Sequence, residues 1–197
     1  MHLSEGVLTG PVLVAAIAAT AVGTAVGLRK LKNEDIPKAS LLSASFFVAT
    51  FIHLPIGVGS VHLVLNGIIG LMLGWTAFPV ILVALLLQGV MFQFGGITIL
   101  GVNTIIMAVP SVICFYLFKN YIRNNGNTFL IASFSCGFLA VLLSGLLSAA
   151  ALYISGEEFL DAAYMLIIAN IPVMIGDGII TTLSLSFLRK VQPEILS

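Results

Sequence analysis

The sequence predicts an all-α integral membrane protein, a bundle of about seven transmembrane helices. Of the 197 residues, 59% are hydrophobic and only 8% are charged, whereas soluble domains carry about 25% charged residues. The apolar stretches are also long and uninterrupted, while the strands of a membrane barrel alternate polar and apolar residues. We therefore expect a single polytopic membrane domain over residues 1–197.

Apolar segments follow one another along the whole chain, most of them near the roughly 20 residues that cross a bilayer. They run over about Val7–Leu28, Leu41–Leu54, Val61–Trp75, Phe78–Phe94, Val102–Phe118, Phe129–Ile154 and Phe159–Leu188. The second and third are short, and the Leu54–Gly57 stretch between them is a cluster of helix breakers. These two segments could form a hairpin of short or tilted helices. The alternative to seven transmembrane spans is six.

The basic residues indicate the orientation. With the N-terminus outside, all eight Lys and Arg residues fall in inner loops, as the positive-inside rule requires. They are Arg29, Lys30, Lys32, Lys38, Lys119, Arg123, Arg189 and Lys190. The outer loops, around 55–60, 95–101 and 155–161, contain none. A C-terminus inside requires an odd number of spans, which favours seven over six.

The first six residues, MHLSEG, contain the donors of a metal chelate. The Met1 amine, the His2 backbone nitrogen and the His2 ring can close two adjacent chelate rings around one ion. Planar nitrogen sets of this kind suit Ni(II) or Cu(II). Because His2 is bulky, we expect Met1 to be retained as the first residue. The alternative is an ordinary polar residue on a frayed terminus.

All three histidines, His2, His53 and His62, fall on the predicted outer face. His62 opens the third segment, near the depth at which the chain starts, and is therefore a candidate to complete the nitrogen square. For His53, a structural role beside Pro55 is the better expectation. The alternative for His62 is an interfacial residue whose ring is satisfied by other partners.

Three amides are candidates to support metal ligands through hydrogen bonds, as metal-binding histidines require. Asn66 lies four residues after His62 and would share its helix face. Gln93 and Asn103 flank the glycine-rich outer stretch FGGITILG, which we expect to fold over a site as a lid. Asp177 falls near mid-membrane, where a carboxylate is a functional candidate. We consider two roles for Asp177: relay of protons or ions, and a local structural cap.

Three stretches, MHLSEGVL at the start, VHLVLNG at 61–67 and LLLQGVMFQFGGITILGVNT at 85–104, resemble the CbiM/NikM family. These are the substrate-binding membrane subunits of energy-coupling-factor transporters for cobalt and nickel, and the similarity covers nearly the whole chain. The resemblance implies a seven-helix fold whose start enters the bundle, with a metal held by Met1, His2 and His62. Many relatives carry a histidine within the segment matching 92–96, where this chain has Gln93 and Phe94. That departure favours the nickel branch.

The resemblance also implies partners: a transmembrane coupling subunit, two ABC-type ATPase subunits and, often, a small accessory membrane protein. The sequence contains no GxxxxGK[ST] phosphate-binding loop, so we expect ATP hydrolysis by those partners. The predicted function is capture of Ni²⁺ as substrate from outside a prokaryotic cell, with no enzymatic activity, no cofactor and no nucleic-acid partner. A cobalt-specific subunit of the same type is the first alternative.

Two other classes are disfavoured. A self-sufficient ion-coupled carrier usually contains two inverted repeats, and no internal repeat is visible here. An intramembrane enzyme would use Asp177 or His62 as an acid–base group, but the sequence offers no nucleophile–base pair. Asp161, the carboxylate nearest Asp177 in this region, is sixteen residues away on the same predicted helix.

Overall fold

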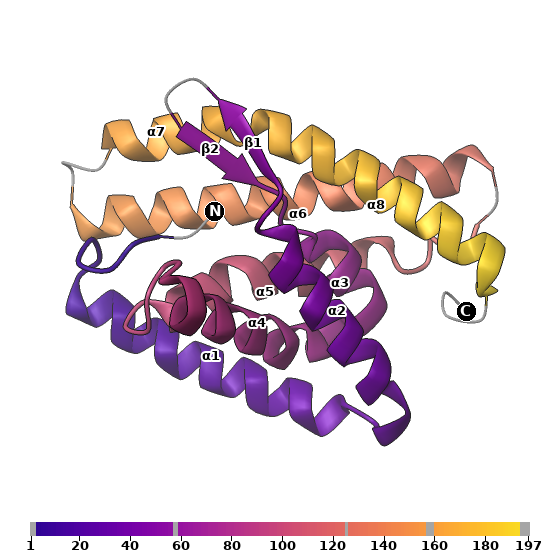
Figure 1. Ribbon diagram of the computed structural model, residues 1–197, viewed down its shortest axis with the longest axis horizontal. Helices are drawn as coiled ribbons and strands as arrows, with labels where there is room; N and C mark the ends of the chain where they lie inside the picture. Colours follow the sequence, from indigo (N-terminus) through magenta and orange to yellow (C-terminus); the bar gives the residue numbers. More distant parts are fainter. Residues whose placement is uncertain (1–2, 57–58, 125, 157–159, 194–197) are drawn as a thin grey trace.

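The computed structural model describes residues 3–56, 59–124, 126–156 and 160–193, which fold into a bundle of helices carrying a small β-hairpin (Figure 1). The elements in chain order are α1 (Gly10–Lys30), η1 (Asn33–Asp35), α2 (Ile36–Ala49), β1 (His53–Ile56), β2 (Gly59–His62), α3 (Asn66–Leu73), η2 (Gly74–Thr76), α4 (Ala77–Phe92), α5 (Leu100–Phe118), α6 (Asn127–Ser155), α7 (Leu160–Ala169) and α8 (Ile171–Val191).

Five stretches in the described part of the chain are long and apolar enough to cross a membrane. They are Gly10–Lys30, Asn66–Phe92, Leu100–Phe118, Asn127–Ser155 and Tyr164–Val191. The predicted helical membrane class is therefore confirmed. Helix α2 contains only 14 residues, fewer than the roughly 17 that a span needs. The count of seven spans and the orientation of the termini stay predictions.

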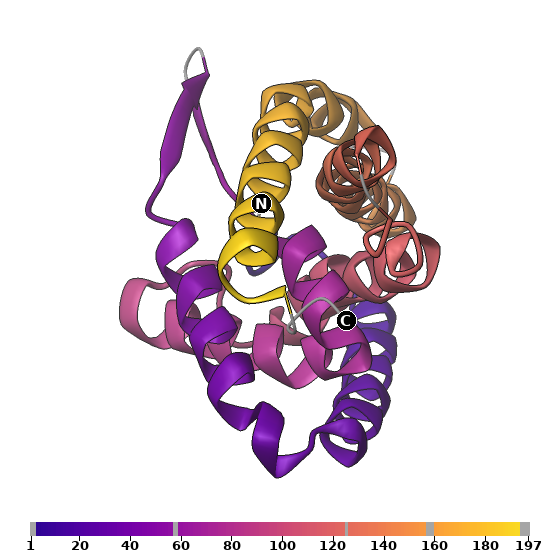
Figure 2. The same ribbon diagram turned by 90° about the vertical axis from the view of Figure 1, so that its right-hand side faces the viewer.

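The third predicted segment is wrong at its beginning. Residues 59–62 form strand β2, which pairs with β1 in an antiparallel register that sets His53 opposite His62. Figure 2 shows this hairpin standing at the edge of the helical bundle. Helix α3 begins only at Asn66, after Leu65 turns the chain with a left-handed φ of 56°. A short apolar run is compatible with either a strand or a helix, so periodicity alone could not separate them.

The last predicted segment is a pair of helices. α7 ends at Ala169 and α8 begins at Ile171, with Pro172 in its first turn. Proline lacks a backbone N–H and fits best in the first turn of a helix, where that N–H has no intrahelical partner, so it favours a new start at this point. Asp161 and Asp177 consequently lie on different helices, against the expectation that they share one.

Glycines bring α8 close to α6 at the level of Asp177. A Cβ atom on Gly137 of α6 would lie 2.5 Å from the Asp177 carbonyl oxygen, and one on Gly178 would lie 2.8 Å from the Phe134 ring. Small residues at such contacts let helix backbones approach closely, which drives packing inside a membrane. The position of Asp177 is therefore fixed by the backbone contact between two long helices.

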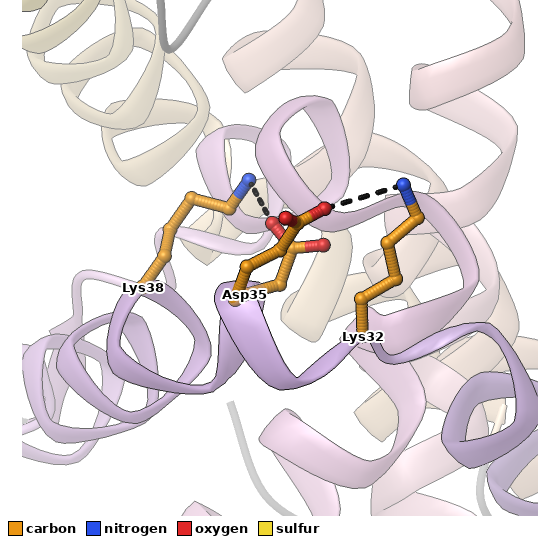
Figure 3. A network of polar contacts seen from close by, with 4 residues as sticks. Lys32, Asp35 and Lys38 are labelled. Carbon is orange, nitrogen blue, oxygen red and sulfur yellow. Dashed lines mark hydrogen bonds and ion pairs between the residues drawn. The ribbon is translucent and has the colours of Figure 1, made fainter.

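The turn between α1 and α2 contains ion pairs at the predicted inner end of the bundle (Figure 3). Lys32 lies 3.3 Å from Glu34, and Lys38 lies 3.0 Å from Asp35. The first pair is exposed and the second is partly buried, and pairs so close to water contribute little to stability. Both basic residues of these pairs, Lys32 and Lys38, therefore lie at the same end of the membrane domain.

Candidate metal site

Asn103 holds the beginning of the described chain against α5. The Leu3 N–H donates to Asn103 Oδ1 at 3.0 Å, and Asn103 Nδ2 donates to the Leu3 carbonyl at 3.2 Å. One amide side chain thus pairs with both polar groups of Leu3, as a neighbouring strand would. Both residues are buried. The two predicted ligands of the chain start, Met1 and His2, immediately precede Leu3 and lie outside the described residues.

Glu5 provides a second attachment of the same segment. The backbone N–H and the hydroxyl of Thr98 both donate to Glu5 Oε1 at 2.9 Å, and they lower the pKa of this carboxyl group. Gly96 makes room for Glu5: its φ is +107°, and a Cβ atom there would clash with the Glu5 carboxyl group. Part of the glycine-rich stretch predicted as a lid therefore contacts the N-terminal segment.

Sequence reasoning did not select Glu5 as a functional residue. Glu5 appeared there only within the stretch MHLSEGVL, one of the three on which the family resemblance rests. Gln93, which was selected, ends α4 in a left-handed conformation with φ of 57° and has an exposed side chain. Gln93 lies at the start of the glycine-rich stretch, whereas Asn103 and Thr98 make the contacts to the N-terminal segment, to Leu3 and Glu5 respectively.

His62 is the last residue of β2 and is partly buried. Its Nδ1 lies 2.9 Å from the Leu63 carbonyl oxygen. A carbonyl only accepts hydrogen bonds, so this contact assigns a proton to Nδ1. In the neutral ring, Nε2 then carries the lone pair that a metal ligand needs.

Asn66 does not lie on a helix face shared with His62, because residues 62–65 are not helical. Its Nδ2 instead donates to Ser144 Oγ at 2.8 Å and to the Ala140 carbonyl at 3.4 Å, both on α6. Ser111 of α5 donates to the Asn66 carbonyl at 2.8 Å. The predicted support of the His62 ring by Asn66 is therefore wrong, and Asn66 anchors the start of α3 between α5 and α6.

Asp177 caps the segment that connects β2 to α3. Its Oδ2 accepts the Val64 N–H at 3.1 Å, and its Oδ1 accepts the Leu65 N–H at 3.2 Å. The residue is 1% exposed, so these bonds lie away from water. Of the two roles expected for Asp177, these contacts are those of a structural cap. The capped segment lies more than 100 residues away in sequence.

No group of three or more His, Cys, Asp or Glu side chains within residues 3–56, 59–124, 126–156 and 160–193 is arranged to hold a metal ion. Cys114 and Cys136 are buried, and their thiols lie against backbone carbonyls of α6 and α3. Met1 and His2, the other ligands that the sequence predicts for a site at His62, lie outside these ranges.

Comparison with protein families identifies the family to which this chain belongs. The profile of the CbiM family, described as "Cobalt uptake substrate-specific transmembrane region", matches residues 2–195. This chain belongs to the CbiM family. It is therefore a membrane component of cobalt or nickel transport, and a multi-pass protein of a prokaryotic cell membrane.

Named relatives of this CbiM-family chain carry transport functions in their names. A Haemophilus influenzae protein named for metal transport is 44% identical over 100% of this chain and 97% of its own. The fused nickel transport protein NikMN of Rhodobacter capsulatus is 38% identical over 55% of this chain and 33% of its own. The cobalt transport protein CbiM of Sorangium cellulosum is 27% identical over 100% of this chain and 94% of its own.

Two solved structures share the CbiM-type fold. A transition metal transporter superposes with a TM-score of 0.83 at 23% identity, covering 97% of this chain and 93% of that one. A truncated transition metal transporter gives a TM-score of 0.81 at 21% identity, with coverage of 96% and 99%. At these identities the likeness concerns the architecture of the helices.

Proposed function

We propose that this protein captures Ni²⁺ as substrate from outside the cell, using the Met1 amine, the amide and ring nitrogens of His2, and Nε2 of His62. The observation that carries the proposal is the double attachment of the N-terminal segment, through Leu3 to Asn103 and through Glu5 to Thr98. It anchors the chain directly after the proposed chelating residues, so that their placement costs less conformational entropy on binding.

The tautomer of His62 supports the same ligand set. Its Nδ1 proton bonds the Leu63 carbonyl, which directs the lone pair to Nε2, in the arrangement usual for metal-ligating histidines. Four nitrogens in one plane favour Ni²⁺ over Zn²⁺, which prefers a tetrahedron. Because the amine and the His2 amide must lose protons to bind, nickel affinity falls as the pH is lowered.

Energy for transport, in this proposal, comes from partner chains: a transmembrane coupling subunit and two ABC-type ATPase subunits, with a small accessory membrane protein in some assemblies. Family membership and the lack of a phosphate-binding loop in the sequence support this arrangement. ATP-driven reorientation would then expose the bound metal to the inside. Uptake into liposomes should require the added ATPase subunits, and transport by this chain alone would contradict that part.

Equilibrium binding of nickel to the purified protein tests the ligand set. We expect near-complete loss of binding with His2→Ala, with His62→Ala, and with one residue inserted before Met1. His53→Ala is the matched histidine control and should retain nickel. Tight binding that survives the insertion would remove the terminal amine from the site.

Cobalt is the second candidate substrate, because the family profile and a relative matched over the whole of this chain are named for it. The absorption spectrum after metal loading separates the two. A planar low-spin nickel complex is yellow and absorbs near the blue end of the visible range. Preferential retention of cobalt from an equimolar mixture would assign the protein to cobalt.

A further inference from the structure

A single peptide group lies between Asp177 and His62. The Leu63 carbonyl and the Val64 N–H belong to the same peptide unit. The carbonyl end bonds Nδ1 of His62 at 2.9 Å, and the N–H end donates to Asp177 Oδ2 at 3.1 Å. Because a peptide is planar and directs these two groups to opposite sides, its orientation is fixed from both ends.

We propose that Asp177 is a positioning residue for the metal site: its carboxylate, acting through the Leu63–Val64 peptide, sets the orientation and tautomer of the His62 ring. The importance of this relay for metal binding rests on the proposed function. The relay itself concerns only residues of this chain and can be tested without metal.

The physical effect of the relay follows from the polarity of hydrogen-bonded chains. A carboxylate that accepts the Val64 N–H polarises the peptide and makes its carbonyl a stronger acceptor, an effect that grows in a medium of low dielectric. A stronger acceptor holds the proton on Nδ1 and makes Nε2 a better donor to a metal. Metal-binding histidines commonly meet a carboxylate directly, and here a peptide lies between the two.

The surroundings keep the relay rigid. The second carboxylate oxygen accepts the Leu65 N–H at 3.2 Å, so Asp177 is held by two successive amides. Leu65 is in the left-handed conformation, and the chain turns there from these amides into α3. Asn66, the next residue, is bonded to α6 and α5. Glycine contacts fix α8 on α6 at the same level, so the Asp177 end of the relay cannot shift without moving a long helix.

Nitrogen NMR of the metal-free protein tests the relay directly, since the chain contains only three histidines. In the wild type we expect His62 to carry its proton on Nδ1. In Asp177→Asn, which replaces one oxygen by an N–H donor facing a backbone N–H, we expect a mixture of the two neutral tautomers. Thr181→Val is the matched control, one turn further along α8 and equally buried, and it should leave the His62 signals unchanged.

Nickel titration completes the test. Asp177→Asn should raise the dissociation constant about tenfold, the lower end of the effect of losing a ligand's hydrogen-bond support. A wild-type His62 protonated on Nε2 would overturn the proposal even if the variant failed to fold. So would an Asp177→Asn variant with unchanged tautomer and affinity. Should the tautomer respond while His62→Ala still binds nickel tightly, the relay stands and the proposed ligand set falls.

Discussion

The two halves of the candidate metal site are held in different ways. The N-terminal segment is attached by Asn103 and by the exposed contact between Glu5 and Thr98, with several bonds to one region, residues 96–103. The segment after His62 depends on one buried carboxylate from a distant helix. Water can replace a lost bond at the exposed Glu5–Thr98 contact but not at the buried Asn103–Leu3 pair or at buried Asp177. Because the N-terminal segment has two separate attachments, it tolerates a single substitution better, and Asp177 is the point at which the site is most easily broken.

The largest expected effect comes from Asp177→Ala, which leaves the Val64 and Leu65 N–H groups buried without their acceptor. We expect it to lower the free energy of unfolding by about 3 kcal/mol. Denaturant titration in detergent micelles measures this loss. Asp161→Ala, which removes an exposed carboxylate on α7, is the control and should change stability by less than about 0.5 kcal/mol. Equal effects of the two variants would contradict the assignment of Asp177 as the buried cap.

The second-largest loss of stability is expected for Asn103→Leu. It keeps the size of the side chain and leaves both polar groups of buried Leu3 unpaired, at a cost of about 2 kcal/mol. Nickel affinity should fall with it, because the chain start loses its anchor. Thr104→Val is the control, since the Thr104 hydroxyl bonds only within its own helix to the Leu100 carbonyl among the described contacts. Unchanged nickel binding in Asn103→Leu would show that Glu5 alone suffices to hold the segment.

Gly96→Ala separates backbone strain from the loss of the Glu5 contact. Alanine in a left-handed backbone costs about 1 kcal/mol, and at Gly96 its Cβ would also displace the Glu5 carboxylate. Gly126→Ala is a matched control, because Gly126 also has a positive φ and nothing lies within 4 Å of the added Cβ. Hydrogen exchange of residues 3–8 should quicken in Gly96→Ala and stay unchanged in Gly126→Ala.

The smallest effect is expected for Glu5→Gln at neutral pH, because the amide oxygen can still accept from Thr98. The difference lies in the pH dependence. The Thr98 bonds lower the pKa of Glu5 below the ordinary value of 4.5, so the attachment is complete above that value and is lost as the pH falls through the lowered pKa. The protection factor of the Thr98 amide, which corrects for the slower intrinsic exchange in acid, should therefore fall as the pH is lowered in the wild type. In Glu5→Gln the protection of the Thr98 amide should show no such change with pH. The same change in both proteins would assign it to another titrating group.

The sequence predicted the membrane class and the long helices because uninterrupted apolar runs have few alternatives. It did not predict the β-hairpin, since a run such as VHLVLNG suits a strand as well as a helix, and only the tertiary fold selects between them. The same error assigned Asn66 to the ring of His62. The contact of Asp177 with Val64 joins segments 113 residues apart, and no local pattern carries such information. Asn103 was selected for its position beside a glycine-rich stretch, and it does contact the chain start.

Helix α2 contains 14 residues and so covers about 21 Å, against a hydrocarbon layer of about 30 Å. Its end is surrounded by aromatic rings, with Phe51 lying 4.8 Å from Phe92 and 6.5 Å from Phe94 between ring centroids. Where a short helix faces lipid, local thinning is one way in which the bilayer adapts. Thinning beside α2 would bring headgroups and water closer to the hairpin, and under the proposed function an ion would then cross less hydrocarbon on its way to His62.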